Sequence, residues 1–142
     1  MAPSYQGDER ADKAVYVVRA EGTFAAAHYL ASYHGKCETL HGHNYRVRAY
    51  AAGRKLDEGG MVLDFGILKK ALREVLARLD HTNLNDHPFF QDNPSAERIA
   101  TYVYEEMVKK LPGTPIWKVE VFETDENLAV YLPYGDTLPP LP

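Results

Sequence analysis

The sequence predicts an α+β fold in which a four-stranded antiparallel sheet carries two helices on one face, in the order β-β-α-α-β-β. Three observations support this prediction. Alternating apolar and polar residues occur toward both ends of the 142-residue chain, and two stretches with helical spacing lie between them. The last two alternating runs are separated by Thr124-Asp125-Glu126, which has the composition of a hairpin turn.

The first two strands are predicted within residues 14–30 and over residues 43–51. In the first of these, Val15, Val17 and Arg19 alternate with Tyr16, Val18 and Ala20. The last two strands are predicted in the runs "IWKVEVFE" and "NLAVYLP", which cover residues 116–123 and 127–133. We expect these four strands to form the sheet.

Two amphipathic helices are predicted between the strand pairs. The first has an apolar stripe made of Ile67, Leu68, Ala71, Leu72, Val75, Leu76 and Leu79. The second begins after Ser95, a residue type that caps free amide groups at a helix start, and "LPGTP" ends it. Its apolar side consists of Ile99, Ala100, Val103, Met107 and Leu111.

Length and composition bound the class of protein. We expect residues 1–142 to form one domain with an ordered core of about residues 14–133, preceded by a flexible leader and followed by a proline-rich tail. A net charge of −4 without a basic block argues against a nucleic-acid partner. No apolar run is long enough to span a membrane, and the first residues do not resemble a signal peptide. One cysteine excludes an intramolecular disulfide, so a cytoplasmic location fits best.

The His-Gly-His triplet at residues 41–43 is the first candidate for chemistry. If residues 41–51 form a strand, His41 and His43 lie on one face together with Tyr45. His28 ends the preceding strand and supplies a third imidazole if the two strands pair. Three imidazoles without a cysteine ligand are typical of a catalytic zinc site, which keeps a position open for water or substrate. The alternative is that the triplet is a surface turn.

Cys37 is the second candidate. A lone cysteine is usually a small buried side chain, but Cys37 lies in a polar loop directly before the predicted metal strand. A nearby cation would favour its thiolate form. Asp80-His81, where the first helix ends, could supply an oriented base for the thiol, although a histidine at a helix end is ordinary.

Glu123 is the third candidate, because it shares a strand face with Val119 and Val121. A carboxylate directed toward apolar residues needs hydrogen-bond donors, and a ligand with a guanidine-like edge would provide them. The alternative is a glutamate on an edge strand that faces solvent.

Several motifs occur together in a fixed order: "FAAAH", "CETLHGHNYRV", "GGMVLDFGILK", "LDHTNLND", "NPSAERIA" and "VFETDENLAVY". They resemble the 6-pyruvoyltetrahydropterin synthase / 6-carboxytetrahydropterin synthase family over about residues 15–131. This resemblance implies the T-fold (tunnelling fold), which assembles as trimers and usually as a dimer of trimers, so we expect a homo-oligomer, a hexamer, with active sites at subunit interfaces. The substrate it implies is a small-molecule pterin, 7,8-dihydroneopterin triphosphate.

The resemblance also implies roles for individual positions. His28, His41 and His43 match the family's Zn²⁺ ligands, and Cys37 matches its catalytic cysteine. Asp80 and His81 match the partners that activate the thiol, and Glu123 matches the carboxylate that binds the pterin ring. The positions of the triphosphate-binding residues are not implied, and Lys36 and Arg46 are candidates on charge alone.

Three branches of the family differ in their product. The motif "LDHTNLND" and the short chain resemble the bacterial lyase of queuosine (7-deazaguanine) synthesis, which forms 6-carboxytetrahydropterin, acetaldehyde and triphosphate. The 6-pyruvoyltetrahydropterin synthases are a second branch. Glu38 after Cys37 resembles a subgroup with Cys-Glu-x-x-His-Gly-His, in which a glutamate serves side-chain cleavage to a 6-hydroxymethylpterin for folate synthesis. We therefore include Glu38 among the candidate catalytic residues.

Two functions without catalysis remain as alternatives. A zinc-containing module that binds a pterin or purine would saturate with ligand and give no product. A structural protein with histidines in its core would melt no earlier without metal than with it.

Overall fold

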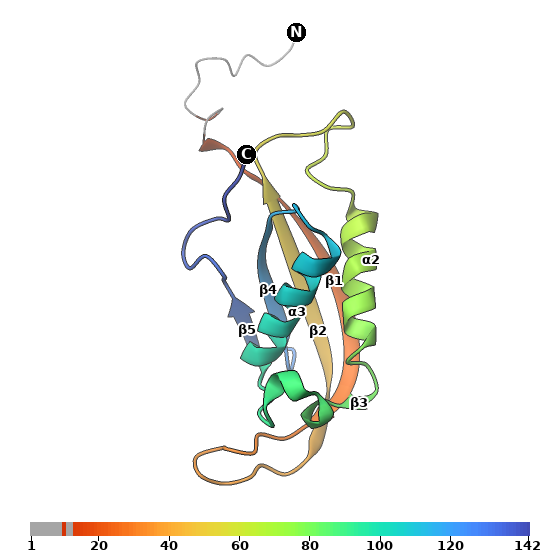
Figure 1. The fold of residues 1–142 in the computed structure, drawn as a ribbon, viewed down its shortest axis with the longest axis vertical. Helices are drawn as coiled ribbons and strands as arrows, with labels where there is room; N and C mark the ends of the chain where they lie inside the picture. Colours follow the sequence, from red (N-terminus) through yellow and green to blue (C-terminus); the bar gives the residue numbers. More distant parts are fainter. Residues whose placement is uncertain (1–9, 11–12) are drawn as a thin grey trace.

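The structure is a computed structural model that describes residue 10 and residues 13–142 (Figure 1). Most of the expected flexible leader therefore lies outside the described residues. Within the described part of the chain, no helix has the length and apolar character needed to cross a membrane. Residues 132–142 contain turns but no helix or strand, as predicted for the proline-rich tail, and Pro139 within them is buried.

One mixed sheet forms the base of the molecule. Its strands are β1 (Tyr16–His28), β2 (His41–Gly53), β3 (Thr82–Asn83), β4 (Ile116–Phe122) and β5 (Leu128–Tyr131), arranged in the order β3-β1-β2-β4-β5. The pairs β1–β2, β2–β4 and β4–β5 are antiparallel, which confirms the predicted four-stranded arrangement.

The strand β3 was not predicted, and it makes the sheet mixed because it runs parallel to β1. It consists of two residues that pair with Ala26 and Ala27. Two residues are too few to show an alternating pattern, so the sequence gives no signal for this strand. The strand β2 is also longer than the predicted residues 43–51, since it begins at His41.

Both helices begin at a capping side chain. In α2 (Phe65–Ala77), the Asp64 carboxylate accepts a hydrogen bond from the Gly66 amide at 2.6 Å. In α3 (Ala96–Lys110), the Ser95 hydroxyl accepts from the Arg98 amide at 3.2 Å, as predicted. Two short 3₁₀ helices, η1 (Leu84–Asp86) and η2 (Pro88–Phe90), lie between them.

One residue of the predicted apolar stripe was placed wrongly. Ile67 is 49% exposed, whereas its neighbour Leu68 is fully buried. Adjacent helix residues are about 100° apart around the axis, so Ile67 falls at the side of the stripe. The other six predicted residues of that stripe are buried.

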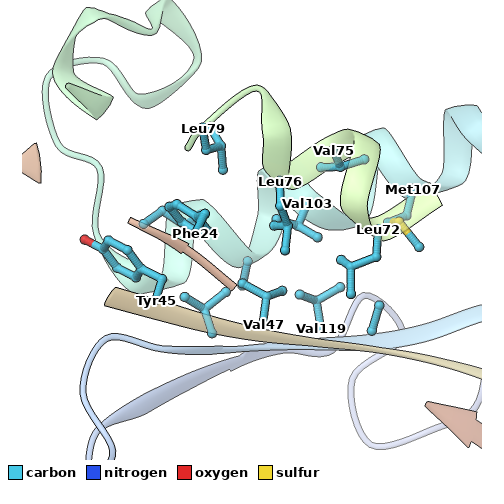
Figure 2. Close-up of a cluster of buried hydrophobic side chains, with 14 of the residues drawn as sticks. Phe24, Tyr45, Val47, Leu72, Val75, Leu76, Leu79, Val103, Met107 and Val119 are labelled. Atoms are coloured by element: carbon cyan, nitrogen blue, oxygen red, sulfur yellow. The ribbon is translucent and has the colours of Figure 1, made fainter. Parts of the chain in front are cut away.

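The hydrophobic core lies between the sheet and the two helices, which cover the same face (Figures 1 and 2). Figure 2 shows Val47 and Val119 rising from the sheet toward Leu72 of α2 and Val103 of α3. Gly22 in β1 permits this close packing, because a Cβ there would lie 2.8 Å from a methyl group of Leu76. Because Val47 of β2 is buried in this core, the alternation of side chains along the strand directs His43 and Tyr45 to the same face.

Candidate active site

Four side chains converge where β1 ends, β2 begins and β4 ends: His28, His41, His43 and Glu123. His28 and His41 lie opposite each other in the β1–β2 register, and His43 follows two residues later on the same face. Glu123 comes directly after β4, the other neighbour of β2. One donor atom from each residue lies within 4.8 Å of the other three, so the cluster could hold a metal ion.

Backbone carbonyl groups orient two of the imidazoles. His28 Nδ1 lies 2.8 Å from the Pro94 carbonyl oxygen, and His41 Nδ1 lies 2.7 Å from that of Thr39. A carbonyl can only accept, so both Nδ1 atoms carry the proton and both Nε2 atoms present lone pairs. These two Nε2 atoms are 3.1 Å apart and face each other, an arrangement that a shared cation would stabilise.

His43 completes the nitrogen donors. Its Nε2 atom is buried without a hydrogen-bond partner in suitable geometry, although it lies 2.8 Å from Glu123 Oε1. Burial lowers the pKa of His43, against the opposing attraction of Glu123, and thus favours the neutral ring that binds metals. A buried, unpartnered nitrogen beside two oriented lone pairs fits a metal ligand.

Glu123 lies among the ring nitrogens of the cluster. Its Oε1 atom is also 3.4 Å from His28 Nε2, and its side chain is 31% exposed. The carboxylate is therefore placed to be a fourth donor to an ion, or to turn toward a ligand through its exposed side. Glu123 follows β4 directly, and Val119 and Val121 of that strand are buried.

The loop that joins β1 to β2, residues 29–40, carries Cys37 and Glu38, and these two side chains diverge. Cys37 is exposed, and its Sγ atom is 3.7 Å from the backbone oxygen of Glu38. Glu38 is half-buried, and its Oε1 atom accepts a hydrogen bond from the Leu30 amide at 3.1 Å. Glu38 is therefore held against the loop's own backbone, whereas Cys37 is exposed to solvent.

Asp80 and His81 form a side-chain pair beside the edge of β1. Asp80 Oδ2 lies 2.9 Å from His81 Nδ1, and Asp80 Oδ1 accepts from the Ala25 amide at 2.9 Å. These hydrogen bonds, first that of Ala25, lower the Asp80 pKa and keep the carboxylate charged. The His81 side chain is 83% exposed. Within the described residues, no hydrogen bond or ion pair joins this Asp80–His81 pair to Cys37.

The sequence of residues 17–133 matches the protein family described as 6-pyruvoyl tetrahydropterin synthase. The chain belongs to this family. It is 36% identical over 140 residues to the 6-pyruvoyl tetrahydrobiopterin synthase of Poecilia reticulata, covering 88% of this chain and 95% of that protein. It is 37% identical over 133 residues to the 6-carboxy-5,6,7,8-tetrahydropterin synthase of Synechocystis, covering 89% of this chain and 99% of that protein.

Solved structures of family members share the fold. The 6-pyruvoyl tetrahydropterin synthase of Caenorhabditis elegans superposes with a TM-score of 0.73 at 31% identity, over 83% of this chain and 95% of that one. A Plasmodium vivax 6-pyruvoyltetrahydropterin synthase superposes with a TM-score of 0.69 at 25% identity, over 82% of this chain and 96% of that one. The latter is described as a variant in which a catalytic glutamate is replaced by alanine. The T-fold expected from the resemblance is thereby confirmed.

Of the two basic residues considered for triphosphate, Arg46 lies on the face of the sheet opposite to the histidine cluster. Neighbouring strand residues point to opposite faces, so Arg46 is directed away from the face of His43 and Tyr45. Its guanidinium carbon lies 4.3 Å from the centre of the Phe122 ring. Lys36 is exposed in the 29–40 loop, where its backbone pairs with Tyr33.

The sequence did not indicate three further features of this pterin synthase-family site. His28 is oriented by the backbone carbonyl group of Pro94, and no side chain in the sequence indicates such a contact. The Tyr45 hydroxyl is buried beside the cluster without a hydrogen-bond partner, with its ring 5.5 Å from that of His43 and 5.8 Å from that of His28. Asn85 holds the backbone at Tyr29, and only its place in "LDHTNLND" could have drawn attention to it.

Proposed function

We propose that the chain is a zinc-dependent 6-carboxy-5,6,7,8-tetrahydropterin synthase. It would act as a lyase that converts 7,8-dihydroneopterin triphosphate and water to 6-carboxytetrahydropterin, acetaldehyde and triphosphate, in queuosine biosynthesis. The observation that carries the proposal is the convergence of three imidazole nitrogens at the end of the molecule where the Cys37 loop lies. Family membership and the similarity to the Synechocystis protein support the choice of pterin chemistry.

Zn²⁺ is the metal that the donor set fits best, because His28, His41 and His43 offer three nitrogens and no thiolate. Bound zinc would polarise an oxygen of the substrate side chain and so make the neighbouring C–H more acidic. The carbonyl groups of Pro94 and Thr39 keep two of the rings in the tautomer that this role needs.

The remaining residues have separate tasks in the proposed reaction. Asp80 holds the Nδ1–H of His81, which leaves His81 Nε2 free to accept a proton from the Cys37 thiol. The Cys37 thiolate, or His81, removes the acidified proton from the substrate side chain and returns it to that side chain after the triphosphate has left. Glu123 accepts from the N3–H and 2-amino group of the pterin, and its partly exposed side chain can turn toward them.

A second candidate function is cleavage of the same substrate to a 6-hydroxymethylpterin with Glu38 as the base. A specific observation favours it, since Glu38 is half-buried with its carboxylate held by the Leu30 amide, while Cys37 is exposed to solvent. The Plasmodium vivax protein with a catalytic glutamate is a structural neighbour of this chain. A chain with both residues is suited to a bifunctional role.

Incubation of the purified protein with dihydroneopterin triphosphate, followed by chromatography of the products, tests the function. The proposal expects 6-carboxytetrahydropterin, with or without a 6-hydroxymethylpterin. Saturable binding of the pterin without any product would identify a binding module and refute the proposed enzyme. Release of 6-pyruvoyltetrahydropterin as the final product would assign the chain to that branch of the family.

We further propose that the active site is completed in a hexamer, a dimer of trimers. Cys37 and the Asp80–His81 pair, although exposed, do not meet within one chain. Exposed apolar side chains lie on both outer long strands, Val17 on β1 and Leu128 on β5, and Phe65 of α2 lies beside β1. Unpaired strand edges favour pairing with another copy. Light scattering at micromolar concentration should therefore give six times the chain mass. A monomer that turns over substrate would contradict the shared site.

We place the enzyme in the cytoplasm. Its single cysteine is exposed and free, which suits a reducing compartment.

A further inference from the structure

The 29–40 loop is held by polar contacts rather than by apolar packing. Its residues 32–37 are all exposed, and the large side chains of Tyr33 and Leu40 are about half exposed. Apolar contacts alone therefore do not determine how Cys37 and Glu38 are placed. The determinant must be found among the hydrogen bonds at the base of the loop.

Asn85 makes the most complete of these contacts. Its Oδ1 atom accepts from the Tyr29 amide at 2.9 Å, and its Nδ2 atom donates to the Tyr29 carbonyl oxygen at 2.9 Å. The same Nδ2 atom also donates to the Asp92 carbonyl oxygen at 3.2 Å. The side-chain amide of Asn85 thus binds both the amide and the carbonyl group of Tyr29, as the backbone of a neighbouring strand would. It also joins the loop to the segment after η2.

Neighbouring residues make further contacts that align residues 26–32 with residues 82–94. β3 pairs with Ala26 and Ala27, and the Pro94 carbonyl accepts from His28. The Ala31 amide donates to the Asp92 carbonyl at 3.1 Å, and the Ser32 amide donates to Asn93 Oδ1 at 2.9 Å. The chain from residue 26 to residue 32 is therefore bound by residues 82–94 at every position except Leu30.

Leu30 pairs with Glu38 instead. The Leu30 amide donates to the Glu38 carboxylate at 3.1 Å, and the Leu30 carbonyl accepts from the Glu38 amide at 2.9 Å. Leu30 thus binds the returning arm of the loop through both its amide and its carbonyl group, whereas its neighbours in residues 29–32 bind residues 82–94. Asn85 binds Tyr29, the residue directly before Leu30, so loss of that contact would free Leu30 to move relative to Glu38.

We propose that Asn85 is a positioning residue that fixes the register of the 29–40 loop, and thereby sets how the reaction divides between Glu38 and Cys37. This inference rests on the proposed function. Asn85 touches neither the histidine cluster nor Glu123, so its effect is expected on the product ratio and kcat and not on metal binding or KM.

The test compares Asn85→Asp with the wild-type protein. Aspartate has the same shape and keeps the acceptor for the Tyr29 amide, but it loses both donors and places a charge against the two carbonyl groups. We expect unchanged zinc content and KM, and a two- to tenfold fall in the ratio of 6-hydroxymethylpterin to 6-carboxytetrahydropterin, about the effect of one or two lost hydrogen bonds. We also expect faster amide hydrogen exchange at Leu30 and Glu38.

Val103→Ala is the control, because it removes core packing in α3 without touching the loop. It should lower the melting temperature and leave the product ratio unchanged. The proposal is overturned if Asn85→Asp keeps both the wild-type ratio and the wild-type exchange rates, or if Val103→Ala shifts the ratio equally. If the wild-type protein forms no product, the proposed function fails, while the exchange rates at Leu30 and Glu38 still decide whether Asn85 fixes the register.

Discussion

Replacing His28 with alanine is expected to remove bound zinc and pterin turnover together. His28 is almost fully buried, and its Nε2 atom lies close to both His41 and Glu123. Purified wild-type protein should hold about one zinc per chain, since the cluster contains one set of converging donors. Loss of a direct ligand should weaken zinc binding by more than the roughly 10–100-fold that follows loss of a residue that only orients a ligand.

Zinc content by atomic emission and product formation should be measured on the same preparations. His41→Ala and His43→Ala should behave as His28→Ala does. His34→Asn is a matched control, because His34 is an exposed histidine outside the cluster and asparagine tolerates its positive φ of 48°. Glu123→Gln should keep zinc and lose pterin affinity. Full zinc content and normal turnover in all three cluster variants would refute the metal assignment.

The second large effect is expected from the adjacent residues Cys37 and Glu38. Their side chains diverge, and thiol and carboxyl groups differ by about four units in ordinary pKa, so each suits the transfer of a different proton. Cys37→Ala should abolish 6-carboxytetrahydropterin and leave some side-chain cleavage to 6-hydroxymethylpterin. Glu38→Ala should do the reverse, and loss of a general base typically costs about 10²- to 10⁴-fold in rate.

Glu38→Gln separates chemistry from loop structure. The amide oxygen of glutamine can still accept from the Leu30 amide, so the loop should keep its shape while the base is lost. Chromatography of the products from each variant gives the result. If no glutamate variant changes either product, Glu38 has no catalytic role and the chain is a 6-carboxytetrahydropterin synthase only. Undiminished 6-carboxytetrahydropterin from Cys37→Ala would remove the thiol from the mechanism.

The sequence predicted those parts of the site that depend on strand periodicity. His41 and His43 had to share a face with Tyr45, because side chains of a strand alternate, and the structure places all three on the buried face. The expected pairing of the first two strands also brought in His28, whose partner in the register is His41. The same alternation predicted that Glu123 shares a strand face with Val119 and Val121, and the structure places its carboxylate 2.8 Å from His43 Nε2.

The features that were missed depend on contacts between distant parts of the chain. Asn85 binds the backbone of Tyr29, and Pro94 binds His28 through a carbonyl group that every residue has. Such partners leave no periodic pattern and no composition signal. The placement of Glu38 was unpredictable for the same reason, because its carboxylate binds the backbone amide of Leu30 on the other arm of the loop.

The relation between zinc occupancy and turnover tests the central claim most directly. Protein stripped with a chelator is titrated with zinc, and metal per chain and product from dihydroneopterin triphosphate are measured at each step. The account predicts that product formation rises in proportion to zinc and reaches its maximum at about one ion per chain. Undiminished product formation by the fully stripped protein, or pterin binding without product at full zinc occupancy, would contradict it.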